Sequence, residues 1–162
     1  MAKVIIAAGS NLGDRLDYLQ QAGKFLSDLT SRPPRKSSVW ESDPVGPAEY
    51  TFLNTVAEVE TDHSPEDLLS ELKQFEQKLG RDANPKRWGP RILDLDIISY
   101  NNLVIQTDTL IIPHPEYHNR LFVLLPMKEL LPKWTDPVSG AEIRTMIRNA
   151  PDLKINKTDY YW

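Results

Sequence analysis

Two aspartates separated by one residue, Asp94 and Asp96, are the residues of this sequence best suited to chemistry. They alternate with Leu95 and Ile97, and this period of two predicts a β-strand with both carboxylates on one face. Neighbouring carboxylates repel each other, and carboxylate oxygens are ligands that Mg²⁺ prefers. The spacing therefore indicates a magnesium site, with a solvated strand edge as the alternative.

The segment before this strand carries fixed positive charges and one large aromatic ring. Arg87 and Arg91 precede the aspartates, and a guanidinium group can bind phosphate oxygens through two hydrogen bonds. Trp88 stands beside a Gly-Pro pair in a polar loop, where a large apolar ring is unexpected unless it closes over a ligand. Metal ligands beside arginines indicate a site for a polyphosphate.

The segment Arg87–Tyr100, which reads RWGPRILDLDIISY, resembles the signature of the 6-hydroxymethyl-7,8-dihydropterin pyrophosphokinases, enzymes of folate biosynthesis. Ala8–Gly13, AGSNLG, is a further matching motif, and the resemblance extends from Val4 to Gly140. It implies that ATP donates pyrophosphate to the hydroxymethyl group of the pterin and that AMP is released. The chain is therefore expected to be an ATP-dependent diphosphokinase.

The resemblance also implies roles for individual residues. Asp94 and Asp96 would hold two Mg²⁺ ions on the phosphates of ATP. Phe52 and Phe122 would stack on the pterin ring, and Asn54, two residues along the same expected strand from Phe52, would hydrogen-bond to the ring edge. The expected site residues are, for catalysis, Arg81, Arg91, Asp94, Asp96 and His114; for the pterin, Ser42, Asp43, Val45, Phe52, Asn54, Trp88 and Phe122; and for ATP, Glu76, Arg81, Arg87, Trp88, Arg91, Ile97, His114 and Arg120.

Several of these residues have a plain structural alternative. Phe52 and Phe122 could each be ordinary core residues, because buried aromatic side chains are common. Glu76 is expected on the helix face away from Leu72 and Leu79, where it would orient arginines of the site or simply contact solvent. A single arginine or histidine is more often a surface residue, and only the coincidence with the family pattern favours a site.

The chain departs from the family pattern at three positions. Ala83 replaces an arginine that some members carry in the loop before the aspartates. Pro115 follows His114 where other members have an aromatic residue, and Thr109 lacks a positive charge that some relatives have near the nucleotide. Phosphate contacts from the loop would then depend on its remaining basic residues.

The elements that must position these residues alternate between strands and helices. The order β-α-β-β-α-β predicts an α+β, ferredoxin-like core with a C-terminal helical extension. Ser64 is expected to cap the second helix by bonding to Asp67. The expected elements are strand Lys3–Ala8, helix Asp14–Leu29, extended segment Lys36–Glu41, strand Phe52–Glu60, helix Pro65–Leu79, strand Leu93–Tyr100, a return strand Leu103–Ile105 after a turn at Asn101 and Asn102, and helices within Pro113–Leu131 and at Ala141–Asn149.

Two polar, proline-bearing loops, Ser42–Thr51 and Arg81–Pro90, border the expected site residues. We expect both to be mobile without ligand and to order when nucleotide and pterin bind together. No repeat or linker divides the chain, so one domain covering residues 1–162 is expected.

Composition and charge restrict the possible functions. The chain has 162 residues, a net charge of −4 and no cysteine, which excludes disulfides, thiolate catalysis and a cysteine-based zinc site. The negative charge disfavours nonspecific binding to nucleic acid. No apolar run reaches the ~18–20 residues that span a bilayer, and the N-terminal apolar stretch indicates a first strand rather than a signal peptide. We expect a cytoplasmic monomer that binds small molecules and neither nucleic acid nor membrane.

Two other functional classes stay open at this point. Another magnesium-dependent nucleotide enzyme, such as a nucleotidyltransferase, also uses paired aspartates but releases pyrophosphate. A ferredoxin-like module that binds single-stranded RNA would need exposed aromatic residues on adjacent strands and a basic surface. The net charge and the acidic pair Asp94 and Asp96 disfavour that module.

Overall fold

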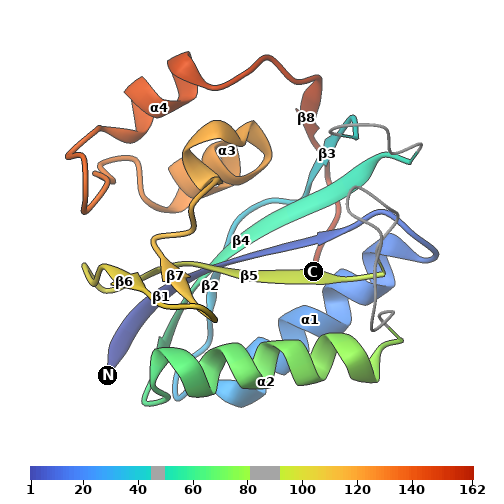
Figure 1. Ribbon diagram of the computed structural model, residues 1–162. Helices are drawn as coiled ribbons and strands as arrows, with labels where there is room; N and C mark the ends of the chain where they lie inside the picture. Colours follow the sequence, from blue (N-terminus) through green and yellow to red (C-terminus); the bar gives the residue numbers. More distant parts are fainter. Residues whose placement is uncertain (45–49, 81–91) are drawn as a thin grey trace.

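The computed structural model describes residues 1–44, 50–80 and 92–162. An antiparallel sheet forms the centre of the molecule, with helices packed on both of its faces (Figure 1). Arg15–Leu29 (α1) and Pro65–Lys78 (α2) cover one face, and Leu121–Leu130 (α3) and Ile143–Asn149 (α4) cover the other. The expected α+β class is confirmed.

Five of the six strands that this sheet has among the described residues lie in the order β5–β1–β4–β3–β8. They are Asp94–Tyr100 (β5), Ala2–Ser10 (β1), Phe52–Thr61 (β4), Trp40–Ser42 (β3) and Ile155–Lys157 (β8). The sixth, Arg35–Lys36 (β2), also pairs with β4. The strands β1 and β4 lie in the centre. β5 pairs with the free side of β1, and both β2 and β3 pair with the free side of β4. The sheet therefore has the expected ferredoxin-like β-α-β-β-α-β order.

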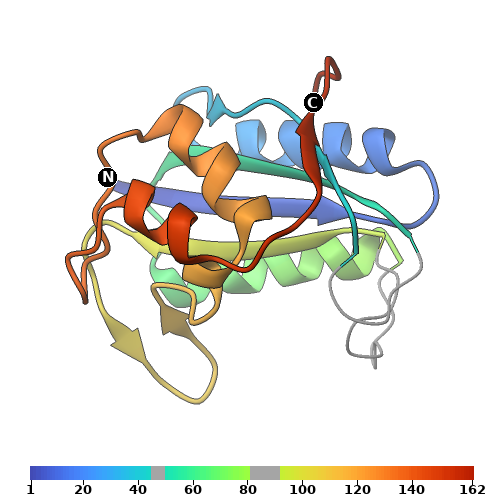
Figure 2. The same cartoon turned by 90° about the horizontal axis from the view of Figure 1, so that it is seen from above.

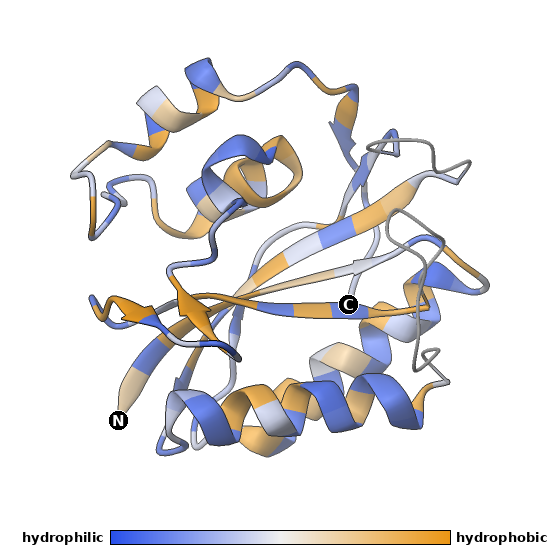
Figure 3. Cartoon of the chain, viewed as in Figure 1, coloured by the Kyte–Doolittle hydropathy of each residue, from blue (hydrophilic) through white to orange (hydrophobic). Residues whose placement is uncertain are grey.

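The two central strands are apolar because helices cover both faces of the sheet. On β1, Val4 and Ile6 lie in the core beneath α1 and α2, whereas Ile5 lies in the core beneath α3 and α4. Figure 3 shows hydrophobic residues along much of β1, β4 and β5, interrupted by hydrophilic ones. This division between two cores decides which residues of each strand can reach a site on the α3 side.

Side chains that accept hydrogen bonds from backbone N–H groups fix the starts of α1 and α2. The carboxylate of Asp14 accepts the backbone N–H of Asp17 at 3.1 Å before α1. Ser64 Oγ accepts the backbone N–H of Asp67 at 3.2 Å before α2, with Pro65 in the first turn, so the predicted cap is confirmed. The two helices therefore begin where local sequence signals place them.

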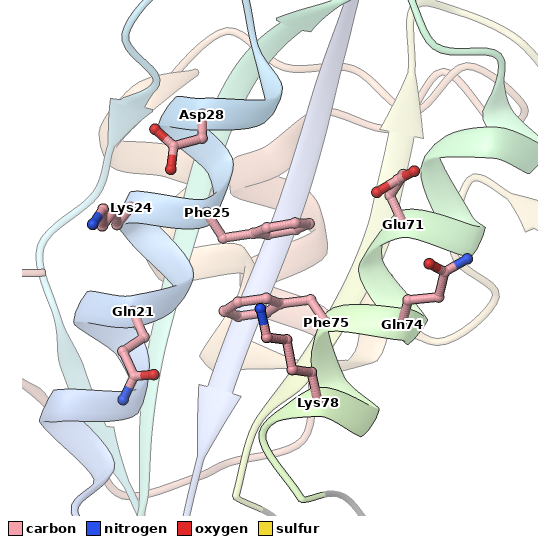
Figure 4. Close-up of a pocket in the computed structure, with 8 residues that line it drawn as sticks. All are labelled: Gln21, Lys24, Phe25, Asp28, Glu71, Gln74, Phe75 and Lys78. Carbon is pink, nitrogen blue, oxygen red and sulfur yellow. The ribbon is translucent and has the colours of Figure 1, made fainter.

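A groove of about 600 Å³ runs between α1 and α2 (Figure 4). Phe25 and Phe75 stack across it with ring centroids 4.2 Å apart. Polar side chains of both helices line the rest of it. The groove lies on the α1 and α2 side of the sheet, opposite to the face that α3 covers.

The return strand expected at Leu103–Ile105 differs from the structure. The segment after β5 does not return along it: Ile105–Gln106 (β6) pairs instead with Ile111–Ile112 (β7) in a separate ribbon. Thr107 closes that ribbon, because its backbone N–H donates to the carbonyl of Leu110 and its hydroxyl accepts the N–H of the same residue. The expected turn at Asn101 is present, with a φ of 50°.

The extended segment expected at Lys36–Glu41 splits into β2 and β3. Ser37 separates them because its N–H donates to the carbonyl of Val56 and its hydroxyl accepts the N–H of that residue. The strand β8 was not predicted; it pairs with β3 through Ile155, Asn156 and Lys157 and lies beside it in Figure 2. No helix among the described residues is long and apolar enough to cross a membrane.

Candidate active site

Asp94 and Asp96 face the same side of β5, as their spacing predicts. Leu95 and Ile97 lie in the core beneath α1 and α2, whereas Ile98 lies in the core beneath α3 and α4. Because side chains alternate along a strand, both carboxylates share the face of Ile98. The two aspartates therefore open on the α3 side of the sheet.

In the protein alone, the ionised form of Asp96 is disfavoured by its surroundings. Burial and the charge of Asp94 raise the pKa of Asp96 to about 6, although the cations Lys73 and Arg120 act in the opposite direction. A divalent cation would relieve this repulsion. No group of three or more histidine or acidic side chains forms a complete metal cage in the described part of the chain. Mg²⁺ is commonly held by one or two carboxylates, with its other coordination positions taken by phosphate oxygens and water, so the pair Asp94 and Asp96 fits this ion.

His114 approaches the carboxylates from the segment between β7 and α3. Its backbone N–H donates to the carbonyl of Ile98 at 2.9 Å, which attaches this segment to β5. Its ring Nδ1 accepts the backbone N–H of Glu116 at 3.1 Å, so the ring proton lies on Nε2. Burial, together with the nearby Arg120, lowers the pKa of His114 to about 4, although Asp94 acts to raise it. The ring is therefore neutral near pH 7 and can donate from Nε2.

Asn54 and Ser42 form a buried polar pair on adjacent strands. Asn54 Nδ2 donates to Ser42 Oγ at 2.8 Å and to the backbone carbonyl of Trp40 at 3.3 Å. Both side chains are almost fully enclosed. Phe52 lies directly opposite Ser42 in the pairing of β3 with β4, so its side chain shares this face. The structure thus brings together three of the residues that the resemblance assigns to the pterin.

Gly9 lies between this polar pair and the aspartates. It pairs with Asn54 on one side and with Asp94 on the other. Strands are about 4.8 Å apart, so these two side chains stand roughly 10 Å apart with no side chain between them. The sequence analysis identified the family motif that contains Gly9 but gave this residue no role. A glycine inside an otherwise apolar strand was the feature that could have indicated a close approach to a ligand.

Residues at the start of α3 cover the same face. Phe122 is half-buried and packs against the core cluster that contains Val56 and Ile98. The guanidinium carbon of Arg120 lies 5.5 Å from the centre of the Phe122 ring, within the range of a cation–π contact. Arg120 thus contacts an aromatic ring, and its charge also acts on Asp96.

One expected position, that of the Glu76 side chain, is wrong in the structure. Glu76 is only 2% exposed and lies on the same side of α2 as Leu72, because residues four apart on a helix share a face. Its carboxylate accepts the backbone N–H of Leu95 at 2.6 Å. The side chain of Ile97 is 4% exposed and lies in the core beneath α1 and α2, so only its backbone is left for the predicted nucleotide contact.

Of the remaining expected site residues, Asp43 lies in the described part of the chain and the others lie outside it. Asp43 follows β3 with an exposed side chain, and its N–H donates to the carbonyl of Lys154 at 3.0 Å. The departures at Thr109 and Pro115 are both exposed. Residues 45–49 and 81–91 lie outside the described residues. They include half of the expected mobile loop Ser42–Thr51, all of the loop Arg81–Pro90, and the expected site residues Val45, Arg81, Arg87, Trp88 and Arg91.

Comparison with protein families and curated proteins gives consistent matches. Residues 5–132 match the family described as 7,8-dihydro-6-hydroxymethylpterin-pyrophosphokinase (HPPK). A protein of Bacillus subtilis is 43% identical over 85% of this chain and 83% of its own length. One of Haemophilus influenzae is 39% identical over 97% of this chain and 98% of its own length. Both are named 2-amino-4-hydroxy-6-hydroxymethyldihydropteridine pyrophosphokinase.

Solved structures share the fold at low sequence identity. A crystal structure of HPPK-DHPS in complex with substrates gives a TM-score of 0.70 at 14% identity over 91% of this chain. The wild-type Plasmodium falciparum HPPK-DHPS with pteroate gives the same TM-score and identity. The present chain spans 43% and 42% of those two chains, respectively. At this identity the likeness concerns the fold alone.

Proposed function

This chain belongs to the 7,8-dihydro-6-hydroxymethylpterin pyrophosphokinase family, and we propose that its reaction takes place on the sheet face that α3 covers. It transfers pyrophosphate from ATP to hydroxymethyldihydropterin in folate synthesis. The observation that carries the placement is the row Asp94, Gly9 and Asn54 across three adjacent strands. That row has carboxylates at one end, an amide at the other and no side chain between them.

The amide end of the row is the proposed pterin site. The Nδ2 group of Asn54 already donates to Ser42 Oγ and to the carbonyl of Trp40, so its Oδ1 is the atom available to accept a hydrogen bond from the edge of a pyrimidine-like ring. Its bond to Ser42 Oγ fixes its orientation before any ligand arrives. Phe52 and Phe122 would stack on the two faces of the ring, supported by their half-buried positions on this side of the sheet. Asp43, Val45 and Trp88 complete the proposed set.

The carboxylate end is the proposed site for the triphosphate of ATP. Asp94 and Asp96 would hold two magnesium ions, and bound magnesium would screen the negative charge of the phosphate oxygens. Arg120 and the Nε2–H of His114 are available as donors to phosphate oxygens. Arg81, Arg87 and Arg91 would add charge, and Glu76 would act indirectly through Leu95, while the backbone of Ile97 would contact the nucleotide.

The proposed chemistry requires alignment and charge stabilisation more than a strong base. The hydroxymethyl oxygen attacks the β-phosphorus of ATP and forms a new phosphorus–oxygen bond, while the bond from the β-phosphorus to the α-phosphate oxygen breaks. The hydroxyl proton passes to solvent, and AMP leaves with the bridging oxygen. A neutral His114 would stabilise the departing phosphate through a hydrogen bond without transferring its proton.

The family membership disfavours both the RNA-binding module and a nucleotidyltransferase as the main activity. We further propose, from the sequence, that residues 1–162 form one domain and that the chain acts as a cytoplasmic monomer on small-molecule substrates.

Phosphorus NMR of a reaction with ATP, Mg²⁺ and 6-hydroxymethyl-7,8-dihydropterin tests this function. We expect AMP and a pterin diphosphate ester in equal amounts. Stoichiometric ADP would identify transfer of a single phosphoryl group, and free pyrophosphate with a nucleotide adduct would identify a nucleotidyltransferase. Either result would contradict the proposal.

A further inference from the structure

Two side chains of α2, those of Glu76 and Lys73, form hydrogen bonds with the backbone of β5 at the residue between the two aspartates. Leu95 stands between Asp94 and Asp96, and its N–H donates to Glu76 Oε1 at 2.6 Å. Its carbonyl accepts a hydrogen bond from Lys73 Nζ at 2.7 Å. These two groups point away from β1, at the side of β5 where the described part of the sheet ends, and Figure 1 shows α2 running along β5 there. Without α2, this segment would present unpaired backbone groups.

Lys73 also connects this backbone anchor to the acidic pair. Its Nζ lies 3.1 Å from Glu76 Oε1 and 3.8 Å from Asp96 Oδ1. An ammonium group has three donors, and here it faces a carbonyl and two carboxylates. The distance of 3.8 Å is too long for a hydrogen bond, so the ammonium acts on Asp96 through its charge and on Leu95 through a direct bond.

The position of Lys73 has opposite consequences for geometry and for charge. The bond to Leu95 fixes the backbone from which both carboxylates project. The positive charge lies close to the carboxylate that would bind a divalent cation, and like charges at this distance repel. Arg120 also acts on Asp96, but it projects from the start of α3, whereas Lys73 projects from α2.

We propose that Lys73 is a positioning residue and resident counter-ion of the Asp94–Asp96 pair, so that it aligns the carboxylates in the metal-free protein and weakens their affinity for a divalent cation. This inference depends on the proposed metal site. It predicts that the charge of Lys73 and its hydrogen bond can be separated by substitution. Gln at this position keeps a donor without the charge, Arg keeps the charge, and Met keeps neither.

Manganese titration of the purified protein without nucleotide, followed by electron paramagnetic resonance, measures the charge effect. We expect Lys73→Gln to bind Mn²⁺ roughly three- to tenfold more tightly than wild type, from loss of one unit charge near a divalent ion. Lys73→Arg should bind as wild type does. Lys78→Gln is the matched control, because Lys78 is exposed in the last turn of the same helix and lines the groove on the other side.

Equal Mn²⁺ affinity in wild type and Lys73→Gln would overturn the counter-ion role, as would tighter binding in the Lys73→Arg or Lys78→Gln variants. Asp94→Asn separates this failure from failure of the proposed function. If wild type binds no Mn²⁺, or if Asp94→Asn leaves Mn²⁺ binding unchanged, the metal site itself is misplaced and the counter-ion role falls with it.

Amide hydrogen exchange at Leu95, in protein free of metal, measures the positioning effect. We expect Lys73→Met to exchange this amide at least tenfold faster than wild type, because the Lys73–Glu76–Leu95 arrangement loses its ammonium, whereas Lys73→Gln retains protection. Exchange in core amides of β1 serves as the reference for global unfolding. Wild-type protection of Leu95 in a folded Lys73→Met protein would overturn the positioning role.

Discussion

Asp94 and Asn54 stand on either side of the same residue, Gly9, in the central part of the sheet. The carboxylate and the amide are therefore held on rigid strands at a fixed separation, and the absence of a side chain at Gly9 keeps the space between them open. We expect a pterin bound at Asn54 to extend over this glycine, with its hydroxymethyl group directed toward the aspartates.

The first prediction concerns Gly9→Ala. A Cβ at this position would meet atoms of Phe52, Leu53 and Asn54, each at 3.7 Å, which is ordinary van der Waals contact. The fold should therefore be retained, with a melting temperature close to that of wild type. The added methyl group fills the space proposed for the ring, so pterin affinity should fall about tenfold or more, ~1.4 kcal/mol. Calorimetric titration measures this change, and unchanged pterin affinity in the folded variant would place the ring elsewhere.

The second prediction concerns the acidic pair. Asp94→Asn and Asp96→Asn should each lower turnover at saturating Mg²⁺ to less than about a tenth of wild type, because one metal ligand is weakened. Neither change should lower the melting temperature of the metal-free protein, since each relieves like-charge repulsion. Asp108→Asn, in the exposed turn between β6 and β7, is the control for loss of one negative charge. Turnover above a tenth of wild type in either site variant contradicts the metal assignment.

The third prediction concerns the pH dependence of stability. The raised pKa of Asp96, about 6, means that the folded protein keeps a proton that the unfolded chain, with a pKa of 3.8, has already released. The stability contributed by this proton is present below pH 3.8 and is lost as pH rises through about 6. An asparagine at position 96 does not titrate, so Asp96→Asn does not show this loss. The free energy of unfolding of the variant should therefore rise relative to that of wild type between pH 4.5 and 7.5.

Urea unfolding of both metal-free proteins at several pH values measures this difference. His114 acts in the opposite direction: its lowered pKa, about 4, removes stability as pH falls below its ordinary value of 6.5. Because His114 is present in both proteins, its effect largely cancels in the comparison. A constant difference between the two proteins across this pH range would show that the pKa of Asp96 is not raised.

The fourth prediction concerns the aromatic pair. Phe52→Ala or Phe122→Ala should weaken pterin binding by roughly 1–3 kcal/mol, the scale of stacking between an aromatic side chain and a heterocyclic base. ATP affinity should change little. Phe25→Ala is a suitable control, because Phe25 stacks with Phe75 in the groove on the opposite side of the sheet. A folded variant that loses ATP affinity and keeps pterin affinity would reverse the assignment of that residue.

Local sequence patterns determined the elements and the orientation of the main site residues. Alternation around Asp94 and Asp96 was sufficient to place both carboxylates on one face, because side-chain direction in a strand depends only on position along it. The cap formed by Ser64 and Asp67 was predictable for a similar reason, since its donor and acceptor are three residues apart. The family resemblance then added the substrates and the roles, which periodicity does not contain.

Tertiary structure alone decided the features that depend on segments far apart in the chain. The pairing of β6 with β7 and of β8 with β3 was not evident, because each strand is short and finds its partner through register. The burial of Glu76 depends on where β5 packs against α2, and the relation of Gly9 to Asp94 and Asn54 depends on the alignment of three strands. Such contacts form only when the hydrophobic faces of helices and sheet come together, so they are absent from any single stretch of sequence.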